Sequence, residues 1–428
     1  MSKTYGDVMY LNVMGQPVVI VNTLRHATEL LDKKAANLSS RPESAMFQLL
    51  GLNKYMVFMP YGRSLREHRR AFRGTYGPDA IAQWQPVQLK TARTLLRRLL
   101  ASPKDFLSHL NLAIAETSMR VSYGIELKDD GSDREYYEMV ERVRRIAEPL
   151  LHPGAYIMQA FPFLLHLPSW LPGLHIKRNA MEQRRDIDAI TDKLYTVAAT
   201  ADENGSLRDS MVARILAAAD TKDVHAAEVR EMGRTLTAVA YVAGSDTTHA
   251  IMEALFLAMA MHPDKQRQAQ QELDAAVGSD RLPTFSDVGS LPYLRAVVKE
   301  TLRWHTILPA GLPHVALADD EYEGYYIPAG TVVNQNIWAM SKDEREYPDP
   351  HAFVPERFLP SEGNPPARDP AEYVFGFGRR VCPGRSFAEA SLSIYCASVL
   401  HVFDILPPLD EHGRPVEMQY RPTDDMVS

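Results

Sequence analysis

Cysteine is scarce in this sequence, and basic residues do not outnumber acidic ones. The 428 residues include 2 cysteines, too few for a disulfide framework or a four-cysteine zinc site, and this favours a reducing compartment. The 47 lysines and arginines against 54 aspartates and glutamates give a formal net charge of −7. General binding to nucleic acid needs a basic face, so we expect no nucleic-acid partner.

Long uninterrupted apolar runs are also missing. The N-terminus, "MSKTYGDVMYLNV", lacks the apolar stretch of a signal peptide. The most apolar segment, residues 155–174, is interrupted by three prolines and three polar residues, whereas a membrane-spanning helix needs about 20 apolar residues in a row. We expect an apolar surface segment here. With 45% hydrophobic residues, the chain is still expected to be globular with a sizeable core.

Strand signals are few, and most of the chain has helical periodicity. Residues 8–13 and 17–21 predict a hairpin, and a second extended pair is expected around "IPAGT" over 325–334. No repeat or low-complexity linker divides the sequence, so we expect a single domain over 1–428 that is mainly α with small β-sheets. Helices are predicted over 79–100, 105–123, 134–151, 174–201, 207–219, 226–261 and 292–304.

One cysteine lies in a stiff, basic loop, "FGFGRRVCPGRSF", at residues 375–387. Gly376 and Gly378 allow tight turning, and the chain becomes helical from about Ser386. Cys382 therefore precedes a helix N-terminus, where the helix dipole and free N–H groups favour a thiolate, which is a soft metal ligand. The alternative is a surface loop with an inert cysteine.

The spacing Phe375-x-x-Gly378-x-Arg380-x-Cys382-x-Gly384 closely resembles the haem-binding signature of the cytochrome P450 family of haem-thiolate monooxygenases. The resemblance implies a cytochrome P450 fold with the long central helix over a haem (protoporphyrin IX iron) whose proximal ligand is Cys382. It also implies that Phe375 packs against the haem and that Arg380 pairs with a haem propionate. Gly378 and Gly384 would belong to the cofactor-binding loop.

Two further charged motifs agree with this resemblance. Glu300 and Arg303 lie three residues apart, on one helical face, and by themselves would be a solvated surface pair. A later segment, "PERF", contains Arg357. The resemblance implies that Glu300, Arg303 and Arg357 form a buried structural lock near the haem. Loss of one partner would strand a buried charge and cost about 3–5 kcal/mol.

Poor helix formers interrupt the longest predicted helix at "AGSDTT", residues 243–248. They predict a local widening of the helix, as π-bulges give at active sites, or a kink capped by side chains. The segment matches the oxygen-binding motif of the family. The resemblance implies that Ala243 and Gly244 border the cofactor, that Thr247 holds O2 and its protons, and that Asp246 feeds protons from solvent.

The stretch "GRSLREHRR", residues 62–70, is similar to a propionate-binding segment of the family. Leu65 stands where tryptophan is usual, Arg69 takes the place of the propionate-binding arginine, and His314 falls where another propionate donor is often found. Five arginines gather in and after this stretch: Arg63, Arg66, Arg69, Arg70 and Arg73. They are expected to form a solvated helix face or to dock an acidic electron donor, a flavoprotein reductase that draws on NADPH.

By resemblance, the substrate pocket is lined by residues 46–55, 161–167, 240–245 and 307–312, whose apolar side chains suit a lipophilic small molecule. The sequence is most similar to fungal, especially basidiomycete, members of the family, many of which act on terpenoids, steroids or aromatics. We expect a monooxygenase of secondary metabolism that inserts one oxygen atom from O2. The alternatives are a haem-thiolate isomerase or dehydratase that needs no reductase, and a truncated, non-catalytic haem-binding remnant.

Full-length eukaryotic relatives carry an N-terminal anchor and lie on the cytosolic face of the endoplasmic reticulum membrane. This sequence starts just before the first predicted hairpin and ends at "RPTDDMVS", where relatives continue into a final strand. We therefore expect membrane association for the family, but neither the anchor nor the last strand in this chain, which is expected to be able to stay in solution.

Overall fold

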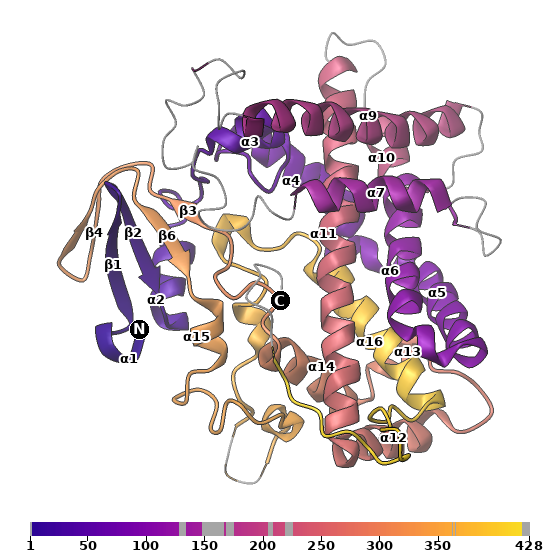
Figure 1. Cartoon of the computed structure of the whole chain (residues 1–428). Helices are drawn as coiled ribbons and strands as arrows, with labels where there is room; N and C mark the ends of the chain where they lie inside the picture. Colours follow the sequence, from indigo (N-terminus) through magenta and orange to yellow (C-terminus); the bar gives the residue numbers. More distant parts are fainter. Residues whose placement is uncertain are drawn as a thin grey trace.

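Helices form most of the protein in the computed structural model, which describes residues 2–127, 134–147, 167, 175–203, 209–218, 226–361, 363 and 365–421. The longest helix, α11 (Ala226–Met261), runs through the middle of the molecule, and a small sheet lies to one side of it (Figure 1). The fold class predicted from the sequence, mainly α with small sheets, is confirmed. None of the described helices combines the length and the apolar character that crossing a bilayer requires.

The main hydrophobic core is shared by α11, α5 (Ile81–Ala101), α6 (Phe106–Tyr123), α14 (Pro292–Trp304) and α16 (Arg385–Val402). Helix α11 packs on α6, α14 and α16, and α5 packs on α6 and α16. These helices bury apolar residues spaced three or four apart, which is why periodicity located them. The other helices are α1 (Ser2–Tyr5), α2 (Leu24–Ala27), α3 (Ala45–Leu49), α4 (Arg63–Tyr76), α7 (Arg134–Ala147), α9 (His175–Glu203), α10 (Met211–Ala218), α12 (Pro263–Val277), α13 (Phe285–Val288) and α15 (Ile337–Ser341).

The hairpin predicted near the N-terminus is confirmed. Strands β1 (Val8–Val13) and β2 (Gln16–Val21) pair antiparallel, and the two-residue turn has positive φ at Met14 (53°) and Gly15 (92°), as a hairpin turn with the right twist requires. β2 continues the sheet by pairing in parallel with β6 (Val332–Gln335). With β3 (His314–Val315) on the far side of β6, the strand order is β1-β2-β6-β3.

The two extended segments predicted around "IPAGT" are confirmed, but they do not pair with each other. β5 (Tyr325–Ile327) pairs with β4 (Asp320–Tyr322), whereas β6 pairs with β2 and with β3. The local turn signal was correct, but the partners were set by burial: β6 places Val333 in the core, at 0% exposure, whereas two of the three β5 residues are exposed.

The local widening predicted at residues 243–248 is wrong, because α11 keeps α-helical hydrogen bonding from Ala226 to Met261. The Thr247 hydroxyl donates to the Ala243 carbonyl oxygen (2.7 Å), and such a bond to the preceding turn accommodates a poor helix former without a break. Among the described residues, wider helical turns occur instead in η1 (Thr28–Lys33), directly after α2. Residues 148–151 of a predicted helix lie outside the described residues.

Candidate active site

The cysteine loop lies between a short helical turn, η9 (Gly378–Arg380), and α16. Its backbone closes through a hydrogen bond from the Cys382 N–H to the Phe375 carbonyl (2.7 Å). Gly378 has φ +53°, and a Cβ there would lie 2.2 Å from the Leu31 carbonyl oxygen. No other residue fits so close to η1. The predicted cofactor-loop position Gly378 thus sets how the loop packs on η1.

The Cys382 thiol is enclosed by protein and still accessible to a ligand. Burial raises the pKa of this thiol, and the N–H groups of Gly384 and Arg385, together with the Arg69 guanidinium, partly offset the rise. The side chain nevertheless remains exposed. Gly384 keeps this side open, since a Cβ there would contact Sγ of Cys382 at 4.0 Å.

Three arginines lie beside one another near this loop: Arg41, Arg69 and Arg380. Burial, followed by mutual repulsion, lowers the pKa of Arg41 to about 9 and that of Arg380 to about 10, and burial lowers the pKa of Arg69. Their acceptors are the backbone carbonyls of Val381, Ser39, Met56, Met59, Val57, Leu312 and Pro313.

These three guanidiniums have no acidic partner in the described part of the chain. Among the described residues, no ion pair joins a carboxylate to Arg41, Arg69 or Arg380. Buried cations normally require a counter-charge, so the cluster fits a ligand with carboxylates, as the two propionates of a haem would supply. Sequence reasoning missed Arg41, whose only signal is an isolated charge in the uncharged stretch "AANLSSRP".

His314 belongs to the same neighbourhood. Its side chain is 1% exposed and its Nδ1 donates to the Leu38 carbonyl (2.6 Å). Burial, followed by repulsion from Arg41, lowers the pKa of His314 to about 3. The neutral ring therefore has no second N–H to offer. To donate to a propionate, as predicted, the His314 ring would have to be protonated, and carboxylates placed beside the ring would favour its protonation.

The "AGSDTT" stretch lies halfway along α11. Ala243 is exposed there although several helices pack around α11, so this face borders open space. Gly244 also has room, because a Cβ there would meet only the Ser118 hydroxyl oxygen, at 3.7 Å. Thr247 and Asp246 are half-buried on the next turn. Ala240, one turn earlier, packs in one apolar cluster with Phe387 of α16, which brings this stretch towards the cysteine loop.

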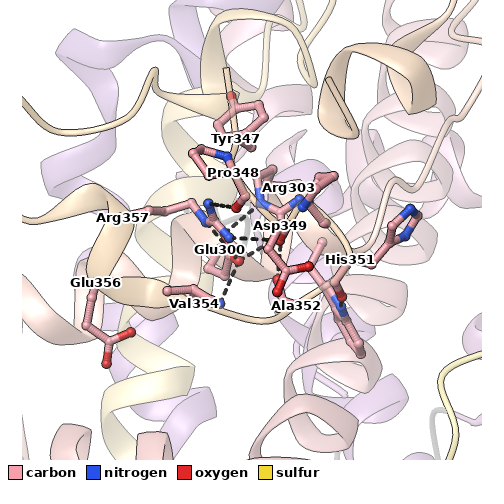
Figure 2. Close-up of polar contacts among 12 residues, drawn as sticks. Glu300, Arg303, Tyr347, Pro348, Asp349, His351, Ala352, Val354, Glu356 and Arg357 are labelled. Carbon is pink, nitrogen blue, oxygen red and sulfur yellow. Dashed lines mark hydrogen bonds and ion pairs between the residues drawn. The ribbon is translucent and has the colours of Figure 1, made fainter. Parts of the chain in front are cut away.

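The structure brings Glu300, Arg303 and Arg357 together (Figure 2). Arg303 donates to both Glu300 carboxylate oxygens at 2.7 Å, and Nε of Arg357 donates to Oε1 at 3.2 Å. Glu300 and Arg303 are 0% exposed and Arg357 is 7% exposed. The remaining N–H groups of the two arginines bind the carbonyls of Ser341, Pro348, Asp349, Pro350 and Ala352. The network thereby fixes the irregular segment that follows α15.

The arginine-rich stretch forms helix α4. Leu65 is 1% exposed and packs in the core, and Arg69 turns inward to donate to the Val381 carbonyl (2.8 Å). Arg66 and Arg379 lie over the Tyr61 ring, at 5.8 and 5.0 Å from its centroid. The exposed side chains of α4 include those of Arg63, Arg66, Arg70 and Arg73, and also that of Glu67, which pairs with Arg63 at 2.7 Å. We call the four arginines the α4 basic face.

Only part of the predicted substrate pocket comes together. Met46 and Leu50 are buried in one cluster with Val239 and Val242 of α11. Ile307, by contrast, packs against a different cluster, that of α14 and α16. The predicted lining over 161–166 lies outside the described residues.

Comparison with known proteins agrees with this geometry. The chain matches the cytochrome P450 family over residues 1–422. It is 38% identical to cytochrome P450 monooxygenase COX1 of Coprinopsis cinerea, over 100% of this chain and 83% of that protein. It is 37% identical to tryptamine 4-monooxygenase of Psilocybe cyanescens, over 97% of this chain and 82% of that protein. These matches show that the chain belongs to the cytochrome P450 family and is a cytochrome P450 monooxygenase.

Proposed function

We propose that this monooxygenase inserts one oxygen atom from O2 into a C–H or C=C bond of a lipophilic small molecule of the terpenoid, steroid or aromatic class. The observation that carries the proposal is the joint placement of an accessible Cys382 and three guanidiniums, that of Arg380 buried and those of Arg41 and Arg69 half-buried, without acidic partners among the described residues. The apolar side chains of Met46, Leu50 and Val242 support a lipophilic substrate. One relative is named for an aromatic amine, tryptamine.

The residues present suit a haem. Sγ of Cys382 would ligate the iron, and Arg41, Arg69 and Arg380 would hold the propionates. When bound, the haem supplies the reductive activation of O2 and the transfer of one oxygen atom to the substrate. The protein orients the reactants and keeps water away.

Thr247 is placed to handle protons. Its hydroxyl proton is directed at the Ala243 carbonyl, so the lone pairs of Oγ1 remain available to accept a hydrogen bond from a donor in the site. Asp246, the next residue on the same turn, would return a proton from solvent to Oγ1 whenever Thr247 gives one up. An isomerase or dehydratase would not need this acid–alcohol pair, which favours the monooxygenase.

Electrons would come from NADPH through a flavoprotein reductase. The α4 basic face lies on the helix that sends Arg69 towards the cysteine loop, and it stands out in a chain with net charge −7. A positive surface near the thiolate would steer an acidic partner to the side from which electrons must arrive.

The test is the spectrum of the reduced, carbon-monoxide-bound protein, followed by turnover with reductase and NADPH. The thiolate-type band should be present in the wild type and absent in Cys382→Ala. The matched control is Cys396→Ala, which removes the only other cysteine, buried within α16, and should retain the band. A thiolate band in Cys382→Ala would refute the ligand assignment. Product formation without NADPH would instead favour the isomerase, and a normal band without any turnover would favour a non-catalytic remnant.

A further inference from the structure

A groove separate from the cysteine loop lies between α3 and α9. It encloses about 590 Å³, a volume typical of small-molecule sites. Leu49 of α3 forms one wall. The α9 wall consists of Lys177, Met181, Arg184, Arg185 and Asp188, whose spacing of three or four residues puts them on one face of the helix.

The charge of this groove is opposite to that of the protein. Three cations line it against one carboxylate, that of Asp188. This carboxylate is already shared, since Lys54 contacts it at 2.7 Å and Arg234 at 3.3 Å, both nearer than Arg184 at 3.7 Å. Lys177 has partners of its own, so the positive charge left over in the groove is that of its arginines, although the whole chain carries −7.

Arg185 contributes most directly to that surplus. It is exposed, and in the described part of the chain it forms no hydrogen bond or ion pair. Arg184 is also exposed, but its guanidinium lies against Gly51, where a Cβ would be 3.1 Å from Nε. The groove thus holds one cation fixed by packing and a second that is available to a ligand.

The same groove has an apolar part. Met181 is 45% exposed, and Leu49 is half-buried opposite it. An inorganic anion would leave these two side chains uncovered, and a neutral lipophile would leave the cations without a counter-charge. The combination matches a ligand with one anionic end and one apolar end.

We propose that the groove between α3 and α9 binds a small amphiphilic carboxylate, such as a long-chain fatty acid, with the carboxylate at Arg184 and Arg185 and the apolar tail along Leu49 and Met181. The site is independent of the proposed oxygenation. α3 separates it from α11, because Met46 and Phe47 on the inner side of α3 pack towards Val239 and Val242.

The experiment measures the fluorescence of cis-parinaric acid, a polyene fatty acid, bound to the haem-loaded protein with imidazole occupying the active site. Saturable binding should persist with imidazole, and dodecanoate should displace the probe whereas 1-dodecanol at the same concentration should not. Arg184→Glu with Arg185→Glu should weaken binding at least tenfold. Arg185→Glu alone, which breaks no described contact, should weaken it several-fold.

The matched control is Arg178→Glu, which makes the same charge change at an exposed α9 position outside the groove lining and should alter affinity less than twofold. An equal loss in this control would show non-specific attraction and overturn the proposal. Loss of the probe on addition of imidazole would place it in the active site instead. A double variant that loses binding only to phosphatidylserine vesicles, and keeps its affinity for free dodecanoate, would identify a lipid surface as the partner and overturn the proposal as well.

Discussion

At the scale of single residues, Lys342 has a pKa far from the usual value of a lysine. Lys342 donates to the Trp304 carbonyl (2.9 Å) at the end of α14. Burial and the nearby Arg303 and Arg357 cations lower the pKa of Lys342 to about 7, although Glu300 opposes the shift. The four charges near the lock therefore include one amine that gives up its proton near neutral pH.

The first prediction concerns the pH dependence of stability. The folded pKa of Lys342 lies below its unfolded value, 10.5, so its protonation opposes folding and the free energy of unfolding should rise with pH between 7 and 10, by at most about 1.4 kcal/mol per unit. Lys342→Met should flatten this rise and be the more stable protein at pH 7. Urea unfolding at several pH values measures how the free energy of unfolding depends on pH. Lys104→Met, at an exposed position, is the control, and a slope unchanged by Lys342→Met would contradict the argument.

Gly378 provides a second prediction. A methyl group there would meet the Leu31 carbonyl at 2.2 Å and would also require φ +53°, so Gly378→Ala should destabilise the protein by about 2–5 kcal/mol and reduce haem content. Gly376→Ala is the matched control, because φ is +75° but the nearest atom lies at 3.6 Å; it should cost only about 1–2 kcal/mol. Thermal melting and haem absorbance per chain measure stability and haem content in the two variants. Equal losses in Gly378→Ala and Gly376→Ala would show that the contact with η1 is unimportant.

At the scale of elements, the lock ties α14 to the segment that leads into the cysteine loop. Glu300 accepts from two arginines and from the Val354 N–H (2.7 Å), so its carboxylate is the centre of the network. Arg357 is the peripheral member, since Arg303 alone still neutralises Glu300. Removing Glu300 should therefore lower the stability of the protein more than removing Arg357.

The third prediction concerns the order in which variants of the lock lose stability. Glu300→Ala should destabilise by about 3–5 kcal/mol, because it strands two buried arginines, and Arg357→Ala should cost less. Arg368→Ala removes exposed pairs with Glu346 (3.0 Å) and Glu372 (3.2 Å) from the same region and should change stability by less than about 1 kcal/mol. Chemical unfolding of the haem-loaded protein ranks the three variants. A loss in Arg357→Ala equal to that in Glu300→Ala would contradict the central role of the carboxylate.

The helices and strands also show which parts of the fold the sequence predicts and which it does not. Periodicity placed α11 and α14 with their observed bounds, helped by Pro263 just after α11 and by Pro292 at the first position of α14. It left out α12, whose polar face outweighs its buried stripe, and α4 was expected only as a charged helix face, without bounds. Strand partners and the position of Arg41 depend on contacts hundreds of residues apart, such as the bond from Arg41 to Pro313 (2.7 Å), which no local pattern encodes.

At the scale of the whole molecule, charge is unevenly distributed. The chain is acidic in total, yet exposed arginines gather on α4, and Arg379 of the cysteine loop adds to them over the Tyr61 ring. An uneven distribution of this kind orients an approaching charged partner before contact.

The fourth prediction tests that orientation. Arg66→Glu with Arg70→Glu should slow electron transfer from a flavoprotein reductase about tenfold at low salt, and the difference from wild type should shrink in 0.5 M NaCl, where charges are screened beyond a few ångströms. Stopped-flow reduction under carbon monoxide follows the rate. Arg93→Glu with Arg97→Glu makes the same change on exposed positions of α5 and should leave the rate unchanged. Equal slowing in both double variants would remove α4 from the docking surface.

The cluster of Arg41, Arg69 and Arg380 bears on how the protein matures in the cell. These three like charges, one buried and two half-buried, repel one another, so folding of the newly synthesised polypeptide has to bring them together against this repulsion. A partner carrying two carboxylates relieves that repulsion at the moment of insertion. Assembly would then act as quality control, because chains that fail to acquire the prosthetic group would keep this repulsion and would be the less stable ones.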